Sequence, residues 1–502
     1  MQNLEKYKGS DSLNEHFGFD DIFTVEDFTA EHKKVAKTAE AFVTEDVIPV
    51  MPEVEKQNFE PLKQLLKKAG ERGLLGVDLP KQFGGGNFDK IHSVIIMEQM
   101  GWSRSFPVPF GGQTGIGSLP ILYYGSKQQK NAYLPDVIAG NKIGAYALTE
   151  PEAGTDALGI KTHAVLSSDQ RYYIINGEKQ WIGNANFADF FIVYTKINGD
   201  QFTAFIVDRN TEGIAIGQEE QKMGLLGSST ASVFLKDVHV PVENVLGDIG
   251  KGHKIAFNIL NIGRHKISAS SLGASKKAMN LAVRHVTSRK QFKRPLSDFT
   301  LIKQKIADMA VKIFAIESTV YRTAGEMAKG AFYCEKNDTE FAEILKAFAI
   351  DCSVNKVFAT EALDEIVDES MQMHGGYGYM REYEIETMYR DARINRIFEG
   401  TNEINRIVIA NSILKEEISL EHKLMDQCSG GLEQEWAQLD LLREGTNDFI
   451  QFVRETYEEP NEEQEVLASM AEFVIDVYIL ESAMIRVEKM MIMIRQKTRI
   501  VI

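Results

Sequence analysis

Arg396-Ile-Phe-Glu-Gly-Thr-Asn-Glu-Ile404 places one carboxylate, that of Glu399, between an apolar pair and the expected start of a helix. Thr401 and Asn402 are residue types that favour the N-cap, and the apolar residues that follow recur at helical spacing. The helix dipole favours an ionised carboxylate here, whereas apolar surroundings disfavour it. An ionised but poorly solvated carboxylate suits a base that removes a proton from carbon. A solvated glutamate in the first helical turn is the alternative that this stretch alone leaves open.

The composition describes a large, acidic chain. It has 502 residues, of which 44% are hydrophobic, enough to bury a large core in roughly two to four domains. The formal net charge of −16, with no long basic run, argues against nucleic-acid binding, so an anionic ligand would need a local basic patch. Three widely spaced cysteines, Cys334, Cys352 and Cys428, indicate neither a disulfide framework nor a metal site.

The first residues and the hydropathy pattern predict a cytoplasmic protein. Residues 1–8 lack the apolar core of a signal peptide and the arginine and serine bias of a transit peptide. No apolar run approaches the ~20 residues that span a bilayer. The cysteine usage fits a reducing compartment.

The order of sequence patterns predicts an α+β fold that is mostly α-helical. Apolar residues at helical spacing predict an N-terminal helical domain over residues 25–142. Short β-branched and aromatic runs predict a small β-barrel or sandwich over residues 143–247. In that block, Asn176-Gly177 and Asn198-Gly199 each separate two such runs, which favours hairpins.

The remaining sequence is again helical. Long segments near 253–290, 300–330 and 340–373 predict a domain resembling a four-helix bundle over residues 248–415. Residues 416–502 are predicted to form a helical extension, either whole or incomplete, which the stretch beginning at Cys428 and an acidic break at 457–463 set apart.

Three motifs outside the Glu399 stretch suggest a bound ligand. The loop Tyr146–Asp156 would expose main-chain N–H groups suited to a polar ring edge or a phosphate, although a plain strand connection is the default. Trp181 ends an expected strand, where its indole could cover a flat cofactor or join the core. Met373-His-Gly-Gly-Tyr-Gly-Tyr379 follows a helix without the dinucleotide-binding spacing, so a helix stop is its simpler interpretation.

Taken in order, these motifs resemble the acyl-CoA dehydrogenase family over residues 25–415. The resemblance also rests on Arg264, on Ser288-Arg-Lys-Gln-Phe292 and on Gln372-Met-His-Gly-Gly376. The region beyond 416 resembles the extension of the very-long-chain branch of that family. The resemblance implies a flavoprotein with FAD between the β domain and the C-terminal bundle.

The resemblance also implies roles for individual residues. Glu399 is the catalytic base, because Gly263 occupies the position where some relatives carry an alternative base. Thr155, Arg264 and Gly400 would contact the acyl-CoA, Arg264 at its CoA moiety. The implied FAD-binding residues are Tyr146, Leu148, Thr149, Gly154, Thr155, Trp181, Ile182, Gly183, Arg289, Gln291, Gln372, Met373, His374, Gly375, Gly376, Thr401, Asn402 and Glu403.

Two further consequences follow from the resemblance. Arg289, Gln291 and the Gln372–Gly376 loop would reach the FAD of a neighbouring subunit, which implies a homodimer or homotetramer. Lys303 stands where many members have glutamine, so residues 299–303 are not assigned to the site.

The activity that the resemblance implies is α,β-dehydrogenation of acyl-CoA to trans-2-enoyl-CoA in fatty-acid β-oxidation. Glu399 would take the α-proton, a hydride would pass to the flavin, and electrons would go on to an electron-transferring flavoprotein. An acyl-CoA oxidase is one alternative, although the large second C-terminal domain usual in oxidases is missing. A non-catalytic assembly partner of the same fold is the other, although Glu399 and the flavin loop are intact.

Chain length and the tail are weaker predictions. The extension favours long acyl chains. Gly111, Gly112, Gly115 and Gly117 could leave room for one, while Phe106 and Phe110 could close that space. The apolar, basic tail over 489–502 predicts a packing helix with a frayed or incomplete end, with peripheral membrane contact as the alternative.

Overall fold

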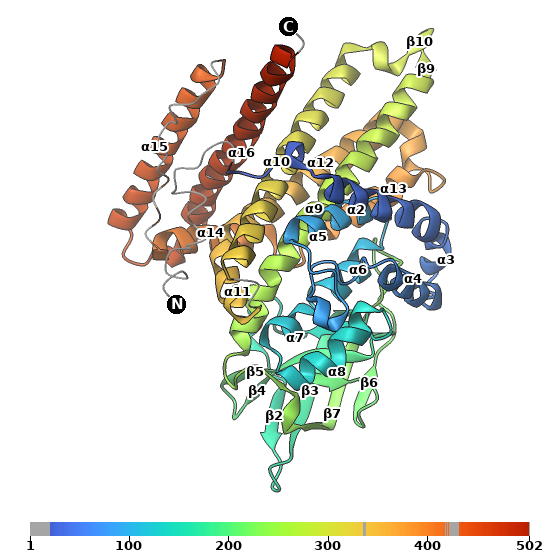
Figure 1. The fold of residues 1–502 in the computed structure, drawn as a ribbon, viewed down its shortest axis with the longest axis vertical. Coiled ribbons are helices and arrows are strands. Elements are labelled where there is room, and N and C mark those ends of the chain that lie inside the picture. The colour runs from blue at the N-terminus through green and yellow to red at the C-terminus, as the bar shows by residue number, and fades with distance from the viewer. Residues whose placement is uncertain (1–20, 335–337, 417, 419, 421–430, 501–502) are drawn as a thin grey trace. The chain divides into compact units, whose positions relative to one another are not determined.

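The structure is a computed structural model that describes residues 21–334, 338–416, 418, 420 and 431–500. The described chain runs through helices, then a sheet, then helices again, which confirms the predicted fold class (Figure 1). It forms two compact units. The sheet unit comprises residues 34–266 and 337–342, and the helical unit comprises residues 1–33, 267–336 and 343–502. The boundaries of the four predicted domains remain a prediction. The predictions made from residues 1–8 and from Cys428 concern residues outside the described part of the chain.

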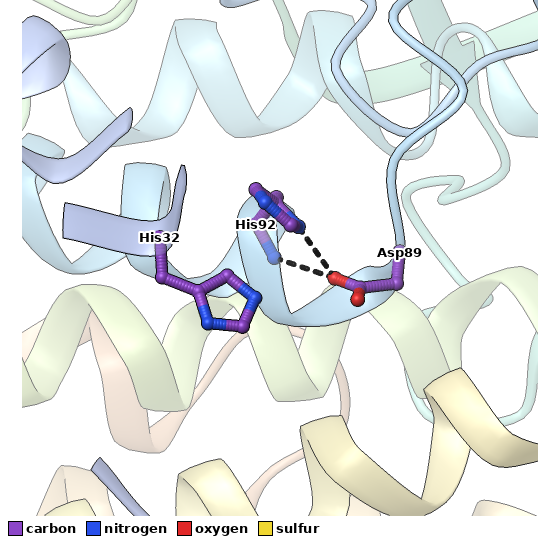
Figure 2. A group of neighbouring side chains, drawn as sticks. All are labelled: His32, Asp89 and His92. Atoms are coloured by element: carbon purple, nitrogen blue, oxygen red, sulfur yellow. Dashed lines mark hydrogen bonds and ion pairs between the residues drawn. The ribbon is translucent and has the colours of Figure 1, made fainter. Parts of the chain in front are cut away.

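The helices before the sheet are short, and polar side chains cap α5 and α8 among them. Asp89 caps α5, because its Oδ1 accepts the main-chain N–H of His92 at 3.2 Å and lies 2.6 Å from the Nδ1 of the same residue (Figure 2). Ser126 and Gln129 form a reciprocal capping box on α8. The helices are α2 (Ala30–Ala41), α3 (Met51–Val54), α4 (Glu60–Glu71), α5 (Lys90–Met100), α6 (Pro107–Thr114), α7 (Leu119–Tyr124) and α8 (Lys127–Ile138).

A mixed sheet forms the centre of the sheet unit. Its pairings run in the order β6-β7-β3-β2-β4-β5-β8, with β1 beside β4. β4 pairs in parallel with β1 and β2, and the remaining pairs are antiparallel. The strands are β1 (Gly144–Ala147), β2 (His163–Leu166), β3 (Tyr172–Gly183), β4 (Phe190–Ile197), β5 (Gln201–Asp208), β6 (Ile214–Ile216), β7 (Thr230–Pro241) and β8 (Val245–Leu246).

The β block is an open sheet in its pairings. The path ends at β6 and β8, which are three and two residues long, and among the described strands no pairing joins them into a barrel. One of the two predicted hairpins is present, since β4 and β5 pair across Asn198 and Gly199, both with positive φ.

The hairpin predicted at Asn176-Gly177 was wrong. β3 continues straight through this pair, and both of its halves hydrogen-bond to the same partner strand, β7. The register shifts between Ile175 and Gly177, so the dipeptide forms a β-bulge. The side chain of Asn176 stabilises the bulge. Its Oδ1 accepts the main-chain N–H of Asp237, and its Nδ2 donates to the Asp237 carboxylate.

Long helices build the helical unit, close to the predicted segments. α12 ends at His374, where the glycine cluster forms a 3₁₀ turn, Gly375–Tyr379. The predicted segment 340–373 is interrupted by a 3₁₀ turn, Leu345–Phe348. The helices are α9 (Gly252–Ser288), which begins in the sheet unit, α10 (Thr300–Tyr333), α11 (Asp338–Ile344), most of which belongs to the sheet unit, α12 (Ala349–His374), α13 (Glu384–Ala392) and α14 (Asn402–Glu416).

The C-terminal extension shares its core with this bundle. α15 (Glu433–Thr456) and α16 (Gln464–Ile500) run alongside each other, separated by the predicted acidic break (Figure 1). Trp436 and Val474 pack in one apolar cluster with Val357 of α12. Buried Glu481 accepts hydrogen bonds from Arg322 and Arg443, so its charge is compensated.

The first residue of the predicted tail, Lys489, packs within the helical unit. The buried Nζ of Lys489 donates to the carbonyl of Ile22 at 2.6 Å and to Asp27 at 2.5 Å. None of the described helices combines the length and the apolar character needed to cross a membrane.

Candidate functional site

Glu399 sits on a strained turn in the helical unit. Its φ is +56°, in the left-handed region that non-glycine residues rarely occupy, and Gly400 follows with a φ of +82°. A short 3₁₀ helix, Arg393–Arg396, leads into the turn. The side chain of Glu399 is half-buried. Strain of this kind at a partly buried carboxylate is typical of functional sites.

The predicted helix start beside Glu399 is confirmed. α14 begins at Asn402, and the hydroxyl of Thr401 accepts the main-chain N–H of Ile404 at 3.3 Å. Glu403 is exposed in the first turn, where its own main-chain N–H and the Thr401 hydroxyl hold the pKa of its carboxyl below the usual range. Glu403 is therefore better suited to capping the helix than to accepting a proton.

Buried polar side chains of α12 and α14 hold the turn. The Gly400 carbonyl accepts hydrogen bonds from Lys356 Nζ at 2.8 Å and from Asn405 Nδ2 at 2.9 Å. Asn402, predicted to border FAD, is 3% exposed, and its side chain bonds to Lys356 and Glu361 within the helical unit. Sequence reasoning missed Lys356, because its contacts lie more than forty residues along the chain.

The loop Tyr146–Asp156 in the sheet unit is also held by a buried lysine. Lys179 Nζ donates to the carbonyl of Leu148 at 3.1 Å and to Glu150 Oε1 at 2.7 Å. Glu150 in turn accepts the main-chain N–H groups of Lys161 and Thr162. Burial lowers the pKa of Lys179 to about 8, against the opposing effect of Glu150. The loop is therefore fixed from within the sheet unit.

Trp181 is well placed to meet a ligand. It lies near the end of β3 with a φ of +56°, and its side chain is 61% exposed in the structure. The alternative that its indole joins the core of the sheet unit was wrong. Neighbouring Ile182 does point into that core, as expected from the alternation of side chains along a strand.

All four glycines predicted to contact FAD face open space, and three of them lack the positive φ that gives Gly375 a reason of its own to be glycine. A Cβ added to Gly154, Gly183 or Gly376 would meet no atom within 4 Å. Their own packing therefore gives no reason for glycine, whereas the close approach of a bound group would. Within the sheet unit, the open positions at Gly154 and Gly183 and the exposed indole of Trp181 fit a flat cofactor such as a flavin.

The glycine cluster after α12 lies beside aromatic and basic groups of the helical unit. His374 stacks on His285 with ring centroids 4.4 Å apart. Arg289 Nη1 donates to the Tyr377 hydroxyl at 3.3 Å, and the guanidinium lies 5.1 Å from that ring. Gln291 is exposed on a small hairpin, β9 (Lys290–Gln291) and β10 (Arg294–Pro295). His285, which the sequence motifs did not single out, therefore lies beside the residues predicted to bind FAD.

Arg264 is less accessible than its predicted role suggests. Its side chain is buried, and Nη1 donates to Asn261 Oδ1 at 2.9 Å.

The predicted site residues are divided between the two units. Tyr146, Leu148, Thr149, Gly154, Thr155, Trp181, Ile182, Gly183 and Arg264 lie in the sheet unit, and Arg289, Gln291, Gln372–Gly376 and Glu399–Glu403 lie in the helical unit.

Comparison with known proteins decides the family. Models of the acyl-CoA dehydrogenase N-terminal, middle and C-terminal domains match residues 29–141, 145–238 and 250–414, and a further C-terminal domain model matches residues 452–502. A probable acyl-CoA dehydrogenase of Bacillus subtilis is 47% identical over 503 residues, which cover 96% of this chain and 85% of the relative. The chain belongs to the acyl-CoA dehydrogenase family.

Two further relatives extend this result. A solved acyl-CoA dehydrogenase from Bacillus anthracis, complexed with FAD, is 43% identical with a TM-score of 0.92, over 96% of this chain and 86% of that one. The human very-long-chain-specific enzyme is 37% identical over 367 residues, which cover 71% of this chain and 53% of the relative. As a member of this family, the protein is an FAD-dependent oxidoreductase.

Proposed function

We propose that this acyl-CoA dehydrogenase forms trans-2-enoyl-CoA from acyl-CoA, with Glu399 as the catalytic base. The observation that carries the proposal is the position of Glu399, a half-buried carboxylate on a left-handed turn directly before α14. The competing carboxylate, Glu403, is exposed and its pKa is lowered by local donors, so it is the weaker base.

Besides the carboxylate, the turn contributes the main-chain N–H of Glu399. An α-proton of a thioester is too weakly acidic for a free carboxylate, so the carbonyl must be polarised while the proton leaves. We propose that the main-chain N–H of Glu399 donates to this carbonyl, an oxyanion-type contact typically worth ~3 kcal/mol. The carboxylate then takes the α-proton. FAD, when bound, supplies the acceptor for the hydride from the β-carbon.

We assign the FAD contacts to two groups of residues, one in the β domain and one in the C-terminal bundle. Tyr146, Leu148, Thr149, Gly154 and Thr155, with Trp181, Ile182 and Gly183, would hold the flavin. Thr155 and Gly400 would also touch the thioester, and Arg264 the CoA moiety. Arg289, Gln291 and Gln372–Gly376 would reach the FAD of a neighbouring subunit, and Thr401–Glu403 would also border FAD. The open glycines and the exposed indole support this assignment.

A long acyl chain in fatty-acid β-oxidation is the proposed substrate class. The similarity to the very-long-chain enzyme and the extension that completes the core around Val357 support it. The glycines near α6 support it less, since an added Cβ on Gly115 or Gly117 would lie within 3.0 Å of main-chain oxygens. Initial rates across butanoyl- to palmitoyl-CoA should peak at long chains, and a maximum at four carbons would contradict this.

The partners are proposed from the family. The electron acceptor is an electron-transferring flavoprotein, and the protein is a cytoplasmic homo-oligomer. Anaerobic acyl-CoA should bleach the bound flavin, and air should restore its colour slowly. Fast reoxidation by oxygen would instead favour an oxidase. Light scattering on the purified holoenzyme measures the oligomeric state, and a monomer would contradict the proposed assembly.

The base assignment is tested by Glu399→Gln, which keeps the size and the main-chain N–H. Flavin reduction by saturating acyl-CoA should slow by ~10²–10⁴-fold with normal FAD content, because general-base catalysis contributes about that much. Glu403→Gln is the matched control and should lose flavin affinity or stability in preference to rate. A near-parent rate in Glu399→Gln would remove Glu399 from the role.

A further inference from the structure

Lys356 is a charged side chain in a place where an apolar one would pack. It lies on α12, is 0% exposed, and neighbours Val354 and Val357 of the apolar cluster. Moving an ammonium group out of water costs several kcal/mol unless hydrogen bonds compensate, and an apolar residue of similar size avoids this cost. The position therefore requires the donors of Lys356 and not merely its volume.

Those donors point at the turn that carries Glu399. Lys356 Nζ donates to the Gly400 carbonyl at 2.8 Å, and Asn405 Nδ2 donates to the same oxygen at 2.9 Å. A left-handed conformation is unfavourable for a residue that carries a Cβ, so Glu399 needs external support to remain at its φ of +56°. Fixing the Gly400 carbonyl fixes the peptide plane between Gly400 and Thr401, one residue after Glu399, and so limits how far the turn can relax.

A second contact ties the same lysine to the start of α14. Asn402 Oδ1 accepts from Lys356 Nζ at 2.6 Å, while Asn402 Nδ2 donates to Glu361 Oε1 at 2.9 Å. Arg406 holds Glu361 with two hydrogen bonds of 2.8 and 2.9 Å. The Asn402 amide is thereby held with its oxygen towards Lys356, so α12 anchors the segment after Glu399 at both Gly400 and Asn402.

We propose that Lys356 is a positioning residue for the proton-transfer step. It holds the Glu399 carboxylate and the Glu399 main-chain N–H in the orientation that the substrate needs. The inference rests on the proposed role of Glu399 as the base. A misplacement of about 1 Å can slow a reaction ~10²-fold, so a modest relaxation of this turn is enough for a large effect.

The first test compares Lys356→Met with a matched buried lysine. In the holoenzyme, Lys356→Met should reduce its flavin 10–100-fold more slowly at saturating acyl-CoA, with FAD content unchanged. Lys489→Met removes a buried ammonium that also donates to a main-chain carbonyl in the helical unit, away from the turn. It should melt at a lower temperature but keep its rate within twofold. Equal rates in the two variants would overturn the proposal.

A second variant keeps the test decisive if Lys356→Met does not fold. Asn405→Leu removes the other donor to the Gly400 carbonyl in a side chain of similar size. It should slow flavin reduction 3–10-fold. An unchanged rate in a folded Asn405→Leu holoenzyme would show that the carbonyl need not be held, and the proposal would fail.

Two readouts separate positioning from general stability and from the base assignment. Glu399→Gln combined with Lys356→Met should lose less than the product of the two single losses, because the carboxylate that Lys356 positions is then already absent, whereas fully multiplied losses would indicate a structural role only. Amide hydrogen exchange over residues 396–404 should be at least tenfold faster in Lys356→Met than in Lys489→Met, and equal exchange would refute positioning. A near-parent rate in Glu399→Gln alone counts against the base, while the exchange measurement still reports on the lysine.

Discussion

The turn at Glu399 and the loop Tyr146–Asp156 are both irregular segments held by one buried lysine, but the two lysines have different acceptors. Lys356 donates to a carbonyl and to an amide oxygen, which are neutral and strongly directional. Lys179 donates to a carbonyl and to the carboxylate of Glu150, which belongs to the loop itself. Neutral acceptors fix an orientation, whereas the ion pair mainly fixes the loop against unfolding. We therefore expect Lys356 to matter most for rate and Lys179 most for stability.

The largest predicted effect is on stability at Lys179. Lys179→Met should lower the free energy of unfolding by about 3–5 kcal/mol, because it leaves the buried Glu150 carboxylate without its cation. Urea denaturation measures this change. Adding Glu150→Gln should recover part of the loss, and Lys356→Met should lose less than Lys179→Met. A larger loss at Lys356 would reverse the comparison.

The same lysine predicts a pH dependence of stability. Burial lowers the pKa of Lys179 to about 8, so between about pH 8 and its ordinary value of 10.5 the unfolded chain binds more protons than the folded one. The free energy of unfolding should then rise with pH in this window by up to ~1.4 kcal/mol per unit from this residue. The difference between parent and Lys179→Met, followed by urea denaturation from pH 7 to 10.5, should show that slope. A flat difference would contradict the shift.

A smaller effect is expected at Gly154, where we propose that the loop contacts the flavin. Gly154→Ala should weaken FAD binding about tenfold, or ~1.4 kcal/mol, while thermal stability of the apoprotein changes little, since the added Cβ meets no protein atom. Gly177→Ala is the control, because its Cβ would lie 2.3 Å from Thr162 Oγ1 and should destabilise the fold instead. Unaltered FAD affinity in Gly154→Ala, measured by fluorescence titration, would count against the flavin contact.

The smallest effect concerns the support behind Asn402. Arg406→Met removes the guanidinium that holds Glu361, a pair that is partly exposed and so worth only about 1 kcal/mol. We expect flavin reduction to slow two- to fivefold, well below the effect of Lys356→Met. Stopped-flow absorbance on both holoenzymes measures the ranking, and a larger loss in Arg406→Met would shift the positioning role away from Lys356.

The two Asn-Gly pairs show what the sequence could predict of the fold. Asn198-Gly199 forms the expected hairpin, since the strands on either side pair with each other. Asn176-Gly177 has the same local chemistry, but both flanking runs pair with β7, and the pair becomes a bulge. Turn chemistry is local and readable from sequence, whereas the choice of partner strand is a tertiary property.

The residues of the candidate site also differ in whether the sequence alone could reveal them. Glu399 could be found because a recognisable motif surrounds it, and the helix start at Thr401 follows from capping chemistry. Lys356 and Lys179 could not, because each acts on a segment distant in sequence, and neither belongs to a motif. A lysine inside an apolar stretch, such as Val354-Asn-Lys-Val357, is the only local signal that one of them offered.

Proton transfer itself can be measured apart from flavin reduction. A 3-thiaacyl-CoA carries sulfur at the β-position, so it can exchange its α-protons but has no β-hydrogen to lose. Bound to the holoenzyme in D₂O, it should exchange those protons readily with the parent and with Glu403→Gln, as followed by proton NMR. With Glu399→Gln the exchange should slow at least 100-fold. Exchange at the parent rate in Glu399→Gln would show that another group takes the α-proton.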